Sequence, residues 1–387
     1  MKTLDGPEVS GRVSYATRNI LWSKSAGRCQ YCNKPLIGDL VSGNGRLIRA
    51  LVAHIVSAKP DGPRGDKNRS PLLVDDVANL MLLCYEHHRL IDIEDVEGHP
   101  DHILLAMKAQ HEERIEIQTS LTEDRQTHLV TFGAPIGSQE APLSYKSIRM
   151  SVLPDHYPAS GRAIHLEVLG CRFRDHEPEY WTFQQDNLSR QFRDKIAGRI
   201  ETGEIRHLSV FGLAPQPLLI ELGRLLCDIC PAEVHQLKRE PKGWGWQFDG
   251  DGIAFQTTES NVASSRVALK LALSATVKDD RIHRVLGSDV PIWSITADNP
   301  HNDIMRRAED LRNFRRLLRR TFDRIKAVNG SHAEIHVFPA MPVSTAIETG
   351  RVWMPKADLP LVIYDENPHH GGFMKTLRIA SAQRLAA

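Results

Sequence analysis

Cys29-Gln-Tyr-Cys32, Ala53-His54-Ile55 and Asn79-Leu-Met-Leu-Leu-Cys84-Tyr-Glu-His87-His88 follow one another in the first third of the chain. Together they carry two sets of potential metal ligands. Cys29, Cys32, Cys84 and His87 have the number and chemistry of ligands that a tetrahedral structural zinc ion needs. An isolated Cys-x-x-Cys pair is also found in redox proteins, but the second pair, Cys-x-x-His, favours a closed zinc site. We therefore predict that Zn²⁺ holds this small lobe together.

A second set of residues remains once zinc is satisfied: His54, Asn79 and His88. A neutral imidazole at His54, at the end of an apolar run that predicts a strand, can take a proton from water. Asn79 can hydrogen-bond to hold that strand or the imidazole in place. His88 can bind a divalent cation, Mg²⁺ or Mn²⁺, that neutralises charge on a scissile phosphate. The trio predicts phosphodiester hydrolysis, against the alternative that each histidine is merely structural.

Composition limits the remaining possibilities. A chain of 387 residues is too long for one ordinary core, and 41% hydrophobic with 25% charged residues is usual for a globular protein. Six cysteines are too few for a disulfide scaffold. No apolar run approaches the roughly 20 residues that span a bilayer, and the N-terminus lacks a secretory signal. We expect a cytoplasmic protein that makes no use of a membrane.

Charge is unevenly distributed although the net charge is only +1. Residues 1–75 carry twelve Lys/Arg against six Asp/Glu, and residues 76–120 carry three against ten. A basic region beside an acidic one suits a protein that meets a phosphate backbone on one face, although local variation on a solvated surface explains it equally well.

The chain divides into three parts. We predict a metal-binding domain over residues 1–120, closed by a helix from Asp101 to Gln118 with apolar positions Ile103, Leu104, Met107 and Ile115. Residues 121–145 collect Gly, Pro, Ser and Gln and predict a linker. Residues 146–387 alternate short strand-like and helical patterns, which predicts an α/β domain.

That last part contains an internal duplication. Residues 210–224 align without a gap to residues 337–351, with seven identities in fifteen positions: Val210/Val337, Phe211/Phe338, Pro215/Pro342, Ile220/Ile347, Glu221/Glu348, Gly223/Gly350 and Arg224/Arg351. Each copy predicts a strand (207–212 and 334–338), a tight turn, and a helix starting near Pro217 or Pro342. Helix N-termini at the carboxyl edge of a sheet attract anions, so two related copies could present two anion sites to one ligand.

We expect the ligand at these turns, unless the two copies merely pack together and binding lies elsewhere. The candidate contacts are Leu213, Ala214, Pro215, Gln216, Pro217, Met341, Pro342, Ser344 and Thr345. Trp244 and Trp246 would share one face of a strand and could stack on a base, but core tryptophans are as common. Cys227 and Cys230 have no visible partner pair and favour buried thiols. The run Ile304–Lys326, with nine basic residues, predicts an amphipathic surface helix, with a subunit or DNA contact as the alternative.

The first third resembles the HNH (ββα-metal) endonucleases in its cysteine knuckle, its strand bearing His54, its central Asn79 and its helix bearing His88. The resemblance implies that His54 is the general base, Asn79 an orienting residue and His88 the ligand of the catalytic metal. Ala53 departs from the pattern, because many such enzymes have an acidic metal ligand there. Asp39, Asp75 and Asp76 are the candidates to replace it, but spacing singles out none of them.

Residues 146–387 resemble a SAVED domain, a sensor of cyclic oligonucleotides built from two CARF-like halves. The resemblance rests on residues 207–224, 241–246, 335–351 and 356–361. An HNH unit followed by SAVED is similar to the DNA-degrading effectors of bacterial CBASS anti-phage systems. This implies double-stranded DNA cleavage, activation by a cyclic dinucleotide of the cyclic GMP-AMP type, and assembly from dimer to tetramer. The alternatives are a restriction-type nuclease that recognises foreign or modified DNA without an activator, and a sensor whose nuclease lobe has decayed.

Overall fold

The computed structural model describes residues 13–38, 45, 47–133, 143–227 and 229–381. It forms two compact units, Met1–Leu121 and Thr122–Ala387, here called the N-terminal and C-terminal units. Among the helices in the described part of the chain, none is long and apolar enough to cross a membrane. Asp39 lies outside the described residues.

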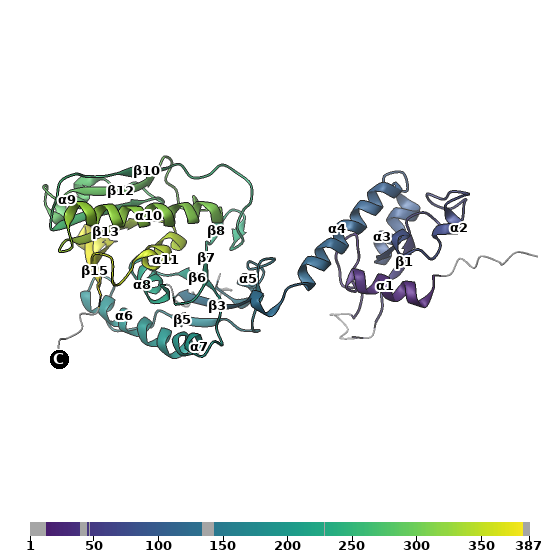
Figure 1. The fold of residues 1–387 in the computed structure, drawn as a ribbon, viewed down its shortest axis with the longest axis horizontal. Helices are drawn as coiled ribbons and strands as arrows, with labels where there is room; N and C mark the ends of the chain where they lie inside the picture. The colour runs from purple at the N-terminus through teal and green to yellow at the C-terminus, as the bar shows by residue number, and fades with distance from the viewer. Residues whose placement is uncertain (1–12, 39–44, 46, 134–142, 228, 382–387) are drawn as a thin grey trace, which may run out of the picture. The chain divides into compact units, whose positions relative to one another are not determined.

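The N-terminal unit is built on a two-stranded antiparallel sheet followed by a helix (Figure 1). Strand β1 pairs with β2 in the register Leu51↔Leu83 to His54↔Leu80, and Cys84 then caps the following helix. The elements are α1 (Tyr15–Ser25), β1 (Leu51–His54), α2 (Ser70–Leu73), η1 (Val77–Asn79), β2 (Leu80–Leu83), α3 (Tyr85–Arg89), η2 (Leu90–Glu94) and α4 (Asp101–Thr119). The arrangement β1–β2–α3 is the ββα order expected from the sequence.

Helix α4 matches the predicted helix in length but buries a different set of residues. Leu104 is buried and Met107 packs on the core, whereas Ile103 is 40% exposed. Lys108 and His111 are buried instead. His111 Nε2 donates a hydrogen bond to the carbonyl oxygen of Ser25 at 3.2 Å, so a polar contact secures part of this face. Because polar residues supply part of the packing, the apolar pattern alone placed the buried face only approximately.

The C-terminal unit contains two mainly parallel sheets. The first has the order β4-β3-β6-β7, with β5 also pairing β3, and the second has the order β10-β12-β11-β13-β14-β15. In the second sheet only the edge strands β10 and β15 pair antiparallel. The strands are β3 (Gln126–Gly133), β4 (Tyr157–Pro158), β5 (Ile164–Glu167), β6 (Leu208–Leu213), β7 (Ala232–His235), β10 (Phe255–Thr258), β11 (Arg266–Ala272), β12 (Ile292–Ala297), β13 (Glu334–Ala340), β14 (Leu361–Asn367) and β15 (Gly372–Ile379), with a small β8 (Lys238–Arg239) and β9 (Lys242–Gly243) hairpin.

Helices connect these strands. They are α5 (Tyr145–Ile148), α6 (Pro178–Phe192), η4 (Arg193–Ala197), α7 (Gly198–Glu201), α8 (Gln216–Leu226), α9 (Asp279–Leu286), α10 (Ala308–Asn329) and α11 (Val343–Val352), with one-turn 3₁₀ segments η3 (Glu123–Arg125) and η5 (Pro368–His370). The predicted amphipathic helix corresponds to α10, which buries Leu311, Leu318, Phe322 and Ile325 as its pattern indicated, whereas Ile304 precedes the helix.

The duplication extends beyond the matched fifteen residues. Strands β5-β3-β6-β7 have the same order and direction as β12-β11-β13-β14. Helices α6 and α10, and likewise α8 and α11, occupy equivalent positions in the chain order. Both predicted strand-turn-helix units are therefore present, as two halves of one α/β unit.

The two halves meet through α8 and α11, which lie side by side (Figure 1). A Cβ on Gly223 would lie 1.9 Å from the carbonyl oxygen of Ile347, and one on Gly350 would lie 1.8 Å from that of Ile220. The four residues are duplicated positions, so the contact is the same when the halves are exchanged. Backbones this close leave no room for a side chain, which explains the two glycines.

Side chains on the sheets alternate between two layers. Val130, Phe132 and Val210 join a large core shared with α8 and α11, whereas Leu129 and Phe211 face a smaller cluster with Trp244. In the second sheet Val267 and Leu269 face the shared core. The shared core contains residues of both halves, so the two halves form one folding unit rather than two adjacent domains.

The predicted linker over residues 121–145 needs correction. Residues 134–142 lie outside the described part, but Gln126–Gly133 is β3, the strand that pairs β4, β5 and β6. The division between the units falls at Leu121. The turn-forming residues of this segment cluster after the strand. The strand itself is buried continuously from Leu129 to Gly133, so it lacks the alternating pattern that indicates a half-buried strand.

Candidate functional site

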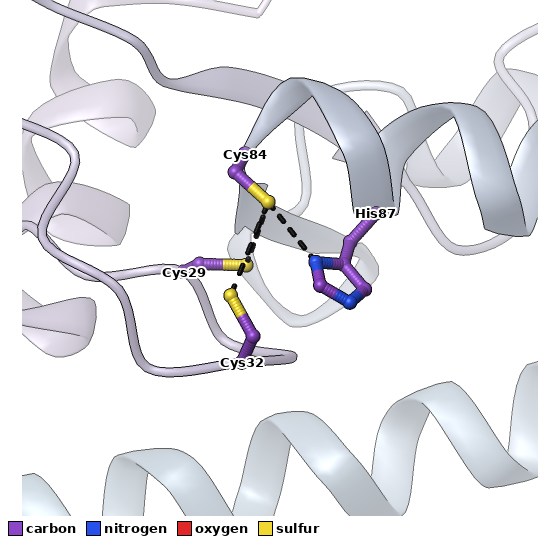
Figure 2. Close-up of side chains that lie close together, drawn as sticks. All are labelled: Cys29, Cys32, Cys84 and His87. Atoms are coloured by element: carbon purple, nitrogen blue, oxygen red, sulfur yellow. Dashed lines mark hydrogen bonds between the residues drawn. The ribbon is translucent and has the colours of Figure 1, made fainter.

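The four predicted zinc ligands come together in the N-terminal unit. Cys29 and Cys32 come from the loop after α1, Cys84 caps α3, and His87 lies one turn into that helix (Figure 2). Cys84 Sγ lies 3.8 Å from Cys29 Sγ, 3.9 Å from Cys32 Sγ and 3.0 Å from His87 Nδ1. All four ligand atoms lie within 4.8 Å of one another. Tetrahedral Zn–S bonds place sulfur atoms about 3.8 Å apart, so the thiols already fit such an ion.

Burial at this cluster opposes charge on the individual side chains. Burial raises the pKa of Cys84 to about 12, because the thiolate loses solvation. Burial also raises the pKa of Cys32 and lowers the pKa of His87. Tyr31 stacks on His87 with ring centroids 4.2 Å apart and fixes the orientation of the imidazole. A bound zinc ion would supply the positive charge that stabilises thiolates and a neutral imidazole here.

His54 lies at the end of β1 with its ring fixed by one hydrogen bond. Its Nε2 is 3.0 Å from the carbonyl oxygen of Val74. A carbonyl oxygen only accepts hydrogen bonds, so Nε2 carries the proton and Nδ1 carries the lone pair. Within the described residues Nδ1 makes no hydrogen bond. The ring is partly exposed, so this lone pair is suited to accept a proton from water.

Asn79 holds the chain around His54 rather than the imidazole itself. Its side chain is buried; Oδ1 accepts a bond from Val56 N at 2.8 Å, and Nδ2 donates to Val56 O at 2.9 Å and to Leu73 O at 3.1 Å. These bonds secure both the segment that follows His54 and the residue before Val74. Of the two roles open from the sequence, the structure therefore has Asn79 holding the strand.

His88 lies on α3 beside a carboxylate that the sequence did not single out. His88 Nε2 is 3.6 Å from Asp92 Oδ2, one helical turn later. By contrast, Asp75 accepts a bond from Ser14 N at 2.7 Å, and Asp76 caps η1 through Ala78 N at 2.9 Å. Asp75 and Asp76, two of the three residues considered as replacements for an acidic ligand at position 53, thus have structural roles. Ala53 is buried in the core and supplies no ligand.

Arg64 connects the segments that carry the two histidines. Its Nε donates to Ile55 O at 2.7 Å, directly after His54, and Nη1 donates to Ile91 O at 2.6 Å. Its Nη2 pairs with Asp92 Oδ1 at 2.5 Å, and the side chain is only 7% exposed. Nothing in the sequence pointed to Arg64, because it lies in a loop without a motif. It is a positioning residue for both candidate catalytic segments.

The predicted ligand-binding turns of the C-terminal unit also meet. Gln216 Oε1 accepts a bond from Met341 N at 3.2 Å, which joins the turn Leu213–Pro217 to the turn at Pro342. Ser344 and Thr345 are fully buried. Ser344 donates to Gln236 Oε1 at 2.8 Å, and Thr345 donates to Pro342 O at 2.7 Å. These two hydroxyls therefore stabilise the turns, and the residues more accessible to a ligand are those from Leu213 to Gln216.

The tryptophan expectation is wrong in its geometry. Residues 244–246 follow β9 and are not in a strand. Trp244 is 2% exposed and packs edge-on against Phe211, with centroids 5.2 Å apart, because it covers the outer face of the first sheet. A base cannot reach it in this structure. Trp246 is half-buried, with its ring 6.5 Å from that of His235.

One family model matches part of the C-terminal unit. Residues 188–379 match the family model described as "SMODS-associated and fused to various effectors sensor domain", SAVED. The match runs from α6 to the end of β15 and includes both duplicated strand-turn-helix units. No curated protein matches the sequence significantly.

Solved structures of SAVED/CARF-domain receptors are similar to this chain at low identity. The Acinetobacter baumannii Cap4 receptor with the cyclic trinucleotide 2'3'3'-cAAA is 13% identical with a TM-score of 0.43, covering 82% of this chain and 67% of that chain. The same receptor with 3'3'3'-cAAA is 12% identical, with a TM-score of 0.43 and coverage of 81% and 71%. The Moraxella osloensis Cap4 receptor is 13% identical, with a TM-score of 0.39 and coverage of 80% and 60%.

Proposed function

We propose that this chain, in which residues 188–379 are a SAVED sensor domain, is a DNA endonuclease that a cyclic dinucleotide activates. The N-terminal unit would be an HNH-type phosphodiesterase, and the C-terminal unit would control it. One observation carries the catalytic half: the Cys/His cluster uses His87, which leaves His54 and His88 available on adjoining elements of a ββα unit. The domain match supports the sensing half.

The chemistry follows from the protonation of His54. Its Nε2–H is held by Val74 O, so Nδ1 can accept a proton from a water molecule as that water attacks phosphorus. A P–O bond to the leaving oxygen then breaks, and that oxygen gains a proton from solvent. Asn79 and Arg64 keep the His54 segment and the His88 segment in fixed positions.

His88 with Asp92 fits a divalent cation. An imidazole nitrogen and a carboxylate oxygen 3.6 Å apart can both turn towards one ion. Mg²⁺ or Mn²⁺ bound there would neutralise charge on the scissile phosphate and on the leaving oxygen. Zn²⁺ at the Cys/His cluster would be structural, because its four protein ligands leave no open position.

The activator would bind at the two βα turns that Gln216 connects to Met341. Each turn precedes a helix N-terminus, where the positive end of the helix dipole attracts phosphate. The Acinetobacter baumannii Cap4 receptor holds cyclic trinucleotides, which supports cyclic oligonucleotides as the class of ligand. Within that class we propose a cyclic dinucleotide of the cyclic GMP-AMP type. Binding would promote assembly from dimer to tetramer and thereby cleavage of double-stranded DNA.

A plasmid-cleavage assay tests the proposal. Purified protein is incubated with supercoiled plasmid, Mg²⁺ or Mn²⁺, and a panel of cyclic di- and trinucleotides. We expect activator-dependent cutting by the native chain, none by His54→Ala, and native cutting by the control His102→Ala, whose side chain is exposed on α4. Cutting without any activator would favour a restriction-type nuclease. Intact plasmid under every condition would favour a sensor without catalysis.

A further inference from the structure

A groove lined by arginines runs along α10 and the end of α11 in the C-terminal unit. Its volume is about 710 Å³, and it is open to solvent. Its lining residues are mostly arginines from two helices: Glu309, Arg312, Arg315, Arg316, Arg319, Arg320, Arg351, Val352 and Met354. Six guanidinium groups therefore face this groove with a single lining carboxylate. It lies along the flank of the helices, apart from the turns where α8 and α11 begin.

Buried carboxylates hold the floor of this arginine groove in place. Glu348, whose side chain is 2% exposed, pairs with Arg351 Nη1 at 2.7 Å and with Arg315 Nε at 2.9 Å. Asp358, 4% exposed, pairs with Arg319 Nη2 at 2.5 Å. Carboxylates beneath the guanidinium groups fix their orientation without occupying the groove.

Several guanidinium groups keep unused hydrogen-bonding capacity. Arg351 is 92% buried, since its residue is 8% exposed, and its Nε has no hydrogen-bond partner. Arg320 forms no ion pair with any described residue. Arg312 and Arg316 share one carboxylate partner, Glu309, and Arg316 also donates to Asn313 Oδ1. Arg351 Nε is too buried for an anion to reach, but the exposed guanidinium groups of Arg312, Arg316 and Arg320 can donate to an anion in the groove.

We propose that the arginine groove binds the phosphodiester backbone of DNA. Arginine presents a planar fork that matches phosphate oxygens, and weak hydration lets it give up water readily. Arg312, Arg316 and Arg320 recur every four residues, so they follow one side of the helix for about 12 Å, as the phosphates of a strand follow one another. The side chains of Arg312 and Arg316 are 65% and 67% exposed, which allows a long polymer to reach them.

This inference rests on the proposed function, because DNA is the substrate proposed for the N-terminal unit. It adds a second contact with DNA, made by the unit that carries the sensor domain. Contacts with phosphate position a nucleic acid without selecting its sequence. The groove therefore raises affinity for DNA of any sequence, and this affinity weakens steeply with salt.

The test compares two variants of the full chain with equal loss of charge. The groove variant carries Arg312→Gln, Arg316→Gln and Arg320→Gln. The control variant carries Arg199→Gln, Arg284→Gln and Arg378→Gln, three solvent-accessible arginines on α7, α9 and β15. Binding to a fluorescent 30-base-pair duplex is measured by anisotropy across a salt series, without added divalent metal. Circular dichroism establishes that both variants are folded.

We expect the groove variant to bind at least about tenfold more weakly at 0.1 M salt, with the log–log salt slope reduced by about 3. The salt slope of the control variant should stay within about 1 of the native slope. Equal weakening in both variants would overturn the proposal, because net charge alone would then explain binding. Native affinity in the groove variant, with a changed sedimentation coefficient, would also overturn it and assign the groove to a second copy of the chain.

Plasmid cleavage in the same preparations separates this inference from the proposed function. If the native chain cuts with activator while the groove variant binds duplex normally, the groove proposal fails and the nuclease proposal stands. If no preparation cuts but duplex binding depends on the groove, the groove proposal stands and the nuclease proposal fails.

Discussion

The contact between α8 and α11 makes a strong prediction about Gly223 and Gly350. Replacing Gly223 with alanine puts a Cβ 1.9 Å from Ile347 O, whereas ordinary contact begins at 3.4 Å, so the helices must separate by roughly 1.5 Å. The obstacle is backbone, which cannot turn aside as a side chain can. Overpacking usually costs about 1–3 kcal/mol, and separated helices also lose dispersion contacts, so we expect at least about 3 kcal/mol.

The assay follows tryptophan fluorescence during heating. Five of the six tryptophans, all but Trp22, belong to the C-terminal unit and report its unfolding. At this size 1 kcal/mol shifts Tm by about 2 °C, so Gly223→Ala should lower Tm by roughly 6 °C or more. Gly198→Ala is the control: nothing lies within 4 Å and the backbone is helical, with φ −62°, so its Tm should be unchanged or slightly raised.

The duplication sharpens this test. Gly350→Ala meets Ile220 O at 1.8 Å and should lower Tm by an amount similar to Gly223→Ala. The double variant should lose less than the sum, because both substitutions open the same contact. A Tm for Gly223→Ala within 1 °C of the native value would refute the packing that we describe between the two halves.

Three further predictions concern single side chains. Arg64→Met should destabilise the N-terminal unit by about 3–5 kcal/mol in calorimetry, because Asp92 and two carbonyls lose a buried partner, and adding Asp92→Asn should recover part of the loss. Asn79→Ala should abolish cutting and speed hydrogen exchange at the Val56 amide by more than tenfold; unchanged exchange would contradict its role. Burial lowers the pKa of His235 to about 3, so the unfolded chain binds more protons between about pH 6.5 and 3, and stability falls as pH falls through that window. The Tm of His235→Phe should therefore fall less than the native Tm between pH 7 and pH 5. An equal fall in both proteins would contradict the lowered pKa of His235.

Local motifs carried most of what the sequence predicted. Cys29, Cys32, Cys84 and His87 are spaced so that a knuckle and one helical turn bring them together, and the structure places them together. The identities at Ile220/Ile347 and Gly223/Gly350 now have a physical explanation, because these residues form the contact between α8 and α11. Because both copies make the same helix contact, both copies carry the same residues at these positions.

Features that depend on distant contacts could not be predicted. Arg64 acts through bonds to Ile55, Ile91 and Asp92, which only the folded loop brings within reach. The sequence made Trp244 a candidate for base stacking, but in the structure it packs over Phe211 on the outer face of the first sheet. Strand β3 was hidden because its neighbours, β5 and β6, are more than 30 residues away in sequence. Pairing partners, rather than local propensity, establish such elements.

The division of the two neighbouring imidazoles between zinc and catalysis is tested most directly by metal content. Zinc per chain is measured by inductively coupled plasma mass spectrometry on native protein, His87→Ala and His88→Ala. Plasmid cleavage is measured on the same samples. The account predicts one zinc in the native chain, retained zinc but no cutting for His88→Ala, and lost zinc for His87→Ala. Loss of zinc from His88→Ala with full retention by His87→Ala would contradict it.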